Sequence, residues 1–119
     1  KAKLAAAQAA WSNDLVRSWN SAGWIDLAER TGDRIAALIG AGKGEVVVTD
    51  NVSVNLFKLA AAALPLARKY VLFVEEDEFP TDQYIMAGLG ALSSAEVRVI
   101  RPIETEAALS AGGVFIRSG

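Results

Sequence analysis

The stretch EVVVTDNVSVNLFKLAAAAL, residues 45–64, decides how this chain is expected to fold. Its first part, residues 45–49, is a short β-branched run that is typical of a buried strand. Its second part has the apolar residues Val54, Phe57, Ala61 and Leu64 at helical spacing and is followed by a proline, which ends a helix. Asp50, Asn51 and Ser53 lie between the two parts and are residues that turn a chain or cap a helix. The stretch predicts a strand that leads directly into a helix.

The start of this helix is a candidate anion site. Backbone N–H groups at a helix N-terminus lack partners within the helix, and the helix dipole places positive charge there, so phosphate binds well. Ser53 would add a hydroxyl donor. The stretch carries no glycine-rich nucleotide motif, so the pattern also fits a capped strand–helix unit without a ligand.

Strands and helices alternate along the rest of the chain. Beyond residues 45–64, the patterns predict helices at 1–19, 26–39, about 81–92 (capped by Thr81 or Asp82) and 105–110, and strands at 69–74, 96–100 and 114–116. This order predicts an α/β protein with a largely parallel sheet. Ligands gather at the carboxyl ends of strands in such sheets, which are expected at residues 50–53 and 75–82.

The composition limits the possible functions. The 119 residues are 52% hydrophobic and 22% charged, with a net charge of −2, which fits one globular domain. A mean hydropathy of +0.27 predicts apolar surface that more chain or a partner covers. No basic stripe stands out, so nucleic acid is not an expected partner. The chain has neither histidine nor cysteine, which excludes a Ser-His-Asp triad, a histidine base and zinc ligation by histidine or thiolate.

Two segments have a plain structural interpretation. The alanine-rich start is too short and too weakly apolar to span a membrane, and it lacks the apolar region of a signal peptide, so the cytoplasm is the expected compartment. The acidic run at 75–78 is expected to be a solvated loop rather than a metal site.

Three side chains have the chemistry of one particular ligand class. Ser53 could bind a ligand phosphate, Phe79 could stack on a ligand ring, and Asp82 could pair with a cationic ring nitrogen. Together these would suit a pyridine cofactor that carries a phosphate. Trp24 lies in a loop with Asn, Ser and Gly. That loop either packs a helix end on the core or presents Trp24 to an aromatic ligand.

Four motifs, in order, resemble bacterial kynureninase: SWNSAGW at 18–24, GDRIAALIGA at 32–41, SVNLFKL at 53–59 and FPTDQY at 79–84. The similarity runs in register from about residue 11 to about 102. It implies a pyridoxal 5′-phosphate enzyme of the aspartate-aminotransferase fold (fold-type I), with a three-layer, mostly parallel sheet. The implied reaction is hydrolysis of L-kynurenine or 3-hydroxykynurenine to anthranilate and L-alanine, in tryptophan catabolism or NAD synthesis, by a homodimer.

The resemblance also implies site residues. Val52 and Ser53 match the pair that holds the cofactor phosphate. Phe79 matches the ring that stacks on the pyridine, and Asp82 matches the carboxylate near the pyridine nitrogen, which keeps that nitrogen protonated. Trp24 is the candidate on the substrate side. Pro80 and Thr81 belong to the same cofactor-binding run as Phe79 and Asp82.

The chain departs from the family in its length. It is expected to be an incomplete large domain over 1–119, with an N-terminal helix and loop region at 1–25 and no complete second domain. None of its lysines lies in the motif of the lysine that binds the cofactor covalently, so no catalytic residue is expected here and the piece alone is expected to be inactive. The strand at 45–49 is expected at a sheet edge, separated from the others by a gap.

Two other interpretations stay open. The chain also fits another fold-type I enzyme, such as a cysteine desulfurase-like or aminotransferase-like protein, although the tryptophan loop and the 79–82 run favour kynureninase. A different class is a non-catalytic α/β module that serves association.

Overall fold

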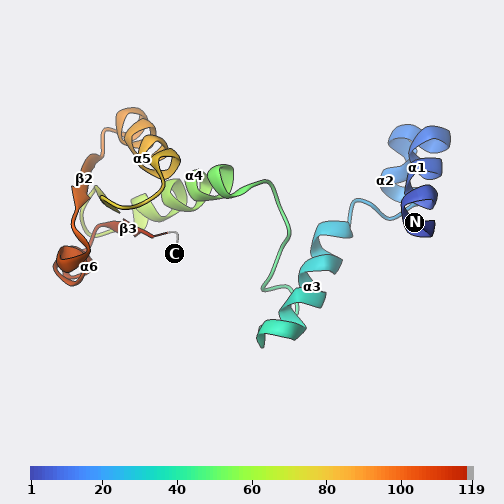
Figure 1. The fold of residues 1–119 in the computed structure, drawn as a ribbon, viewed down its shortest axis with the longest axis horizontal. Helices are drawn as coiled ribbons and strands as arrows, with labels where there is room; N and C mark the ends of the chain where they lie inside the picture. Colours follow the sequence, from blue (N-terminus) through green and yellow to red (C-terminus); the bar gives the residue numbers. More distant parts are fainter. Residues whose placement is uncertain (118–119) are drawn as a thin grey trace. The chain divides into compact units, whose positions relative to one another are not determined.

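The computed structural model describes residues 1–117, so residues 118 and 119 of the expected domain range lie outside the described residues. The chain divides after Thr49 into two compact units, which are the blue-to-teal and the green-to-red parts of Figure 1. Unit 1 begins at Lys1 and unit 2 at Asp50. All the residues predicted to bind the cofactor belong to unit 2, whereas Trp24 belongs to unit 1.

Unit 1 holds three helices and a 3₁₀ turn. These are α1 (Ala2–Asp14), the turn Leu15–Arg17, α2 (Ser18–Ser21) and α3 (Leu27–Ile39). The prediction of one helix over residues 1–19 is wrong, because the backbone breaks at Leu15, where φ is 48°. The buried hydroxyl of Ser18 then donates to the carbonyl of Ala10 at 2.9 Å, which stabilises the turn back toward α1. The helix predicted for 26–39 is confirmed as α3.

The strand predicted for residues 45–49 is wrong, since these residues form no strand. A strand needs a neighbour for its backbone donors and acceptors, and within residues 1–117 none pairs with this segment. Instead the N–H of Val48 donates to the carbonyl of Ala28 on α3 at 3.5 Å. The segment approaches α3 at Gly32, where a Cβ would lie 1.9 Å from the carbonyl oxygen of Val46. Because residues 45–49 form no strand, the gap that was expected between this strand and the others is not found in the described residues.

The sheet of unit 2 is parallel, in the order β2-β1-β3. It consists of β1 (Val71–Glu75), β2 (Glu96–Ile100) and β3 (Val114–Ile116), which confirms the three later strands of the prediction. Every residue of the central strand β1 is buried. This is typical of a parallel strand covered on both faces and explains its uninterrupted apolar run.

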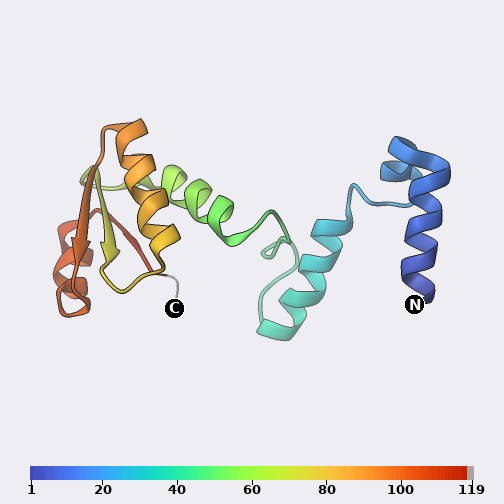
Figure 2. The ribbon, with the colours of Figure 1, turned by 45° about the horizontal axis from the view of Figure 1, so that its top comes forward.

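Helices cover both faces of this sheet. They are α4 (Val52–Ala63), α5 (Pro80–Ser93) and α6 (Thr105–Ala111), with 3₁₀ turns at Leu64–Leu66 and Pro102–Glu104. The helices α4 and α5 pack on one face and α6 packs on the other (Figure 2). The α/β class and the three-layer arrangement predicted from the sequence are thus confirmed for unit 2.

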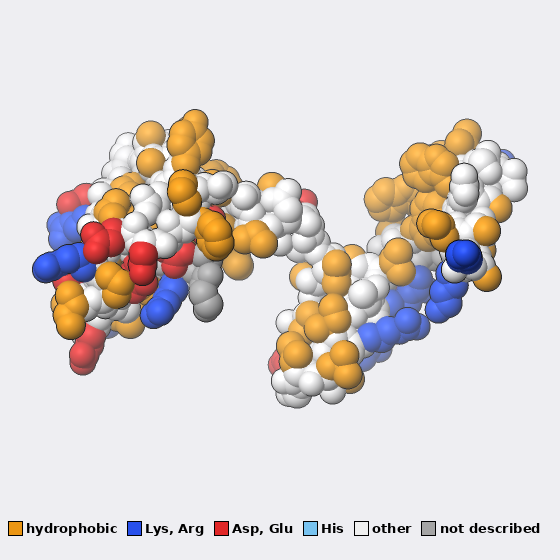
Figure 3. All heavy atoms as spheres, in the orientation of Figure 1, with side chains coloured by type: hydrophobic (Ala, Val, Ile, Leu, Met, Phe, Trp, Pro, Cys, Tyr) orange, Lys and Arg blue, Asp and Glu red, His pale blue; other side chains and the backbone are white. Residues whose placement is uncertain are grey.

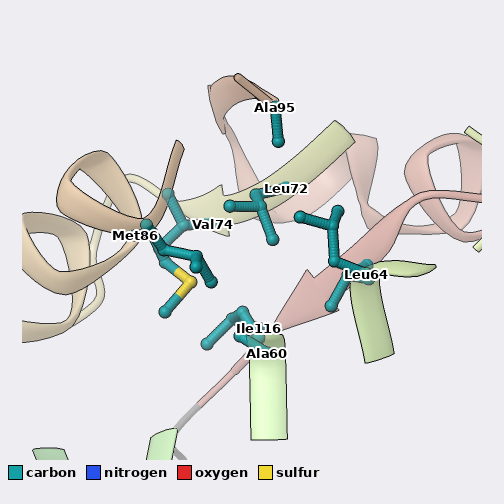
Figure 4. Packing of buried hydrophobic residues seen from close by; sticks show 9 residues of the cluster. Ala60, Leu64, Leu72, Val74, Met86, Ala95 and Ile116 are labelled. Carbon is teal, nitrogen blue, oxygen red and sulfur yellow. The ribbon is translucent and has the colours of Figure 1, made fainter. Parts of the chain in front are cut away.

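The two faces of β1 supply two cores. Leu72 and Val74 pack with Met86 of α5 and with Ala60 and Leu64 from α4 and the turn after it (Figure 4). On the opposite face, Val71 and Phe73 pack with Ala108 of α6. The larger core joins α4 and α5 to the same strand and so holds both helices on one face of β1.

Asn51 caps α4, as its residue type predicts. Its side-chain oxygen accepts the N–H of Val54 at 3.0 Å. We expect Asn51→Ala to lower the free energy of unfolding by about 1 kcal/mol, because this N–H loses its partner. Asn51→Asp, which keeps the acceptor, is the control. Urea denaturation followed by far-UV circular dichroism measures the difference, and equal stability of the two variants would contradict the role of the cap.

Candidate functional site

A cavity of about 400 Å³ in unit 2 is lined by residues from two segments distant in sequence: Val52, Ser53, Phe79, Thr81 and Asp82. The first two residues start α4, and the others lie where the loop after β1 enters α5. The cavity therefore lies beyond the carboxyl end of β1, where parallel sheets bind their ligands. The structure brings these predicted site residues together; Pro80 begins α5 beside them but does not line the cavity.

The α4 side of the cavity presents hydrogen-bond donors. Asn51 already binds the N–H of Val54. Helix geometry leaves the N–H groups of Val52 and Ser53 without a partner inside the helix, and the Ser53 hydroxyl lies on the same turn. Together with the positive end of the helix dipole, these groups form an anion-binding corner.

The turn before α4 has an unusual backbone. Asp50 has a positive φ of 37°, a conformation that a non-glycine residue seldom adopts. Its carboxylate forms an ion pair with Lys58, which lies further along α4. Both side chains are partly exposed, so the pair contributes little stability. The pair does occupy the ammonium group of Lys58. The donors of the anion-binding corner are therefore backbone N–H groups and the Ser53 hydroxyl.

The α5 side presents a ring and a carboxylate. Phe79 is 69% exposed and Asp82 is 4% exposed. The predicted cap, Thr81 or Asp82, is wrong: Phe79 is the N-cap residue, and no side chain caps this helix. The reason is Pro80, whose fixed φ and missing N–H suit the first helical position, so α5 begins there.

This early start places Asp82 in the first turn of α5. The helix dipole stabilises a carboxylate at that position, which offsets part of the cost of burying it. Within residues 1–117, the Asp82 carboxylate makes no hydrogen bond or ion pair. It lines the cavity, so a bound cation or N–H donor would be its partner.

The acidic run at 75–78 is only in part the solvated loop that was predicted. Glu75 ends β1 and is buried, which corrects that expectation for this residue. Its carboxylate accepts a hydrogen bond from the Thr105 hydroxyl at 2.6 Å and lies 3.8 Å from Nε of Arg117. Glu76 and Asp77 are exposed. Among residues 1–117, no cluster of three or more acidic side chains is arranged to hold a metal ion.

Trp24 stacks on Trp11 in unit 1, with ring centroids 5.9 Å apart and planes at 16°. One face of Trp24 is therefore covered by the chain itself, and its role on the substrate side stays a prediction. Within the described residues, no helix has the length and apolar character needed to cross a membrane.

Comparison with known proteins gives one consistent family. No family model matches the chain. It is 55% identical to the kynureninase of Pseudomonas fluorescens over 97 residues, which cover 74% of this chain and 23% of that protein. It is also 51% identical to the kynureninase of Burkholderia pseudomallei (strain K96243) and 50% identical to that of Burkholderia mallei (strain ATCC 23344), each over 86 residues, or 68% of this chain and 21% of the relative. The chain is thus homologous to kynureninases over about 70% of its length, which confirms the resemblance.

Proposed function

We propose that this chain, as a homologue of bacterial kynureninases, provides the phosphate-binding and ring-binding part of a pyridoxal 5′-phosphate site. The reaction we propose is hydrolysis of L-kynurenine, or its 3-hydroxy form, to anthranilate and L-alanine. The observation that carries the proposal is the cavity of about 400 Å³, because the residues that line it are those that the resemblance assigns to the cofactor. The chain spans less than a quarter of the relatives it matches, 23% of the Pseudomonas protein, so the activity is proposed for a complete kynureninase that contains these residues.

The phosphate fits the α4 side of the cavity. A dianion there would be held by the N–H groups of Val52 and Ser53 and the hydroxyl of Ser53, all at the positive end of α4. The Asn51 side chain does not compete with the phosphate for these donors, because its oxygen already accepts the N–H of Val54. Hydrogen bonds to a charged acceptor are the strong ones, so this corner orients the ligand by its phosphate.

The pyridine ring fits the α5 side. The exposed Phe79 offers a flat face for stacking, and Asp82 offers a carboxylate without a partner in the described residues. Bound pyridoxal phosphate supplies an electron sink that works best with its ring nitrogen protonated. Asp82 would hold the proton on that nitrogen, because opposite charges held close stabilise one another.

The chain's own residues bind and orient; we assign no bond-breaking step to them. The lysines of this chain lie outside the family motif for covalent cofactor attachment; they are Lys1, Lys3, Lys43, Lys58 and Lys69. The relatives reported above are all kynureninases, which favours that enzyme over a cysteine desulfurase-like protein.

The proposal includes a homodimeric enzyme in the cytoplasm. Apolar side chains are spread over the surface of both units (Figure 3). In unit 2 they border a groove of about 350 Å³ between α4 and α5, where Phe57, Tyr84 and Leu92 lie. Exposed apolar surface of this kind supports association with further protein.

The test of the cofactor role is a calorimetric titration of the chain with pyridoxamine 5′-phosphate, which lacks the aldehyde that reacts with surface lysines. We expect saturable binding that Ser53→Ala weakens roughly tenfold, because one hydrogen bond to the phosphate is lost. Ser110→Ala, at an exposed position on α6, is the control and leaves affinity unchanged. Absence of saturable binding, or equal effects of the two substitutions, would contradict the proposed role.

A further inference from the structure

The loop between β1 and α5, residues 76–79, is bound by one side chain of α5. The Nε2 group of Gln83 lies 2.9 Å from the carbonyl oxygen of Glu76 and 3.4 Å from those of Glu75 and Glu78. An amide group has two N–H donors, so it serves these acceptors in shared geometry, with Glu76 as the closest. Gln83 therefore connects the first turns of α5 to the backbone that leads into the candidate site.

The same loop carries Phe79, which lines the cavity. On its C-terminal side, the Phe79 carbonyl accepts the N–H groups of Asp82 at 2.8 Å and of Gln83 at 3.3 Å. On its N-terminal side, the backbone is bound by the Gln83 side chain. Because Phe79 is 69% exposed, little packing holds its side chain, and this backbone sets where the side chain starts.

The loop that Gln83 binds is strongly acidic. Glu76, Asp77 and Glu78 are consecutive carboxylates that repel one another, and the buried Glu75 precedes them. A neutral amide donor binds the carbonyl oxygens of this segment without adding charge beside Asp82. The N–H of Glu76, which donates to the carbonyl of Ile100 at 2.9 Å, ties the other side of the loop to the end of β2.

We infer that Gln83 is a positioning residue of the candidate site: by binding the carbonyl oxygens of Glu75, Glu76 and Glu78, it holds the backbone that presents the Phe79 ring to a planar aromatic ring of the ligand. The identity of that ligand rests on the proposed function. The inference that Gln83 fixes the loop rests on the contacts alone. Gln83 acts through Phe79 and does not itself line the cavity.

The first test measures the loop directly, without any ligand. Gln83→Met keeps the length of the side chain and removes the donor. We expect amide hydrogen exchange of Glu76 and Glu78, followed by NMR, to become roughly three- to tenfold faster, as the loss of one hydrogen bond implies. Gln83→Glu places an acceptor against the same carbonyl oxygens. We expect it to speed exchange of these two amides more than Gln83→Met does. Gln8→Met, at an exposed position on α1, is the matched control and leaves these rates unchanged.

The second test separates ring binding from phosphate binding. Gln83→Met is expected to weaken pyridoxamine 5′-phosphate roughly threefold or more, while the shift of the Ser53 amide on titration with inorganic phosphate stays as in the wild type. A merely structural role would weaken both ligands together. Unchanged exchange at Glu76 and Glu78 in both Gln83 variants would overturn the inference whatever the ligand does. Failure of the wild type to bind pyridoxamine 5′-phosphate would instead overturn the proposed function, with the exchange rates still deciding the role of Gln83.

Discussion

Replacement of Asp82 by asparagine is expected to weaken binding of pyridoxamine 5′-phosphate roughly ten- to hundredfold, the range for loss of a hydrogen bond between charged groups. Asp82 as a residue is 4% exposed and lines the cavity, so its interaction with a protonated ring nitrogen is less screened by water than that of a surface pair. Asparagine keeps the shape of the side chain, removes the charge and replaces one acceptor oxygen by an N–H donor group. Calorimetry on the wild type and the variant, at one pH and one salt concentration, measures the change.

The same substitution is expected to change the free energy of unfolding by less than about 1 kcal/mol, because two effects offset one another. Loss of the charge removes a favourable interaction with the start of α5 and also removes the cost of burying a carboxylate. Asp77→Asn is the matched control, since Asp77 is an exposed acid in the loop before α5 and the change in net charge is identical. Equal weakening by the two variants would show a general effect of charge and contradict a contact with Asp82.

The parts of the fold that the sequence predicts are those with a local cause. The strands β1, β2 and β3 are short runs rich in β-branched and aromatic residues, and each lies between turn residues. The start of α4 was predictable because Asn51 is a strong cap. The proposed site residues Phe79 to Asp82 come from one contiguous motif, and the structure adds that Phe79, Thr81 and Asp82 share a cavity with Ser53; their role as a site stays a prediction.

The failures have non-local causes. Residues 45–49 have a strand composition, but a strand also needs a neighbour, which composition does not encode. Val54 and Phe57, predicted to form the apolar face of α4, are each more than a third exposed and border the groove beside α5. The later members of the predicted face do reach the core: Leu64, just after α4, is buried there together with Ala60, and Ala61 packs against it.

The contact of Gln83 was missed for a similar reason. In the sequence it is one polar residue in an amphipathic helix, and such residues usually face water. Its acceptors are backbone carbonyl oxygens, which carry no signature in the side-chain sequence. The available signal was its place directly after Asp82 and one turn after Phe79, where a side chain on α5 can reach back to the preceding loop.

Two glycines of α5 are expected to respond in opposite ways to the same change. Gly90 is buried, and a Cβ there would lie 2.3 Å from Cγ2 of Val97 and 3.1 Å from the carbonyl oxygen of Ala95. We expect Gly90→Ala to lower the free energy of unfolding by about 1–3 kcal/mol, because α5 must move away from β2. Gly88 has no atom within 4 Å of its Cβ position, so Gly88→Ala is expected to raise stability by about 0.5–1 kcal/mol through helix propensity.

The comparison tests packing alone, since both substitutions add one methyl group to the same helix. Urea denaturation of the two variants gives the difference directly. The double variant Gly90→Ala, Val97→Ala removes the methyl group that the new Cβ meets, and it is expected to be more stable than the sum of the two single effects implies. If Gly90→Ala were as stable as Gly88→Ala, α5 would not lie against β2 as the structure has it. The position of Asp82 relative to Ser53 would then be in doubt as well, because α5 carries that carboxylate to the cavity.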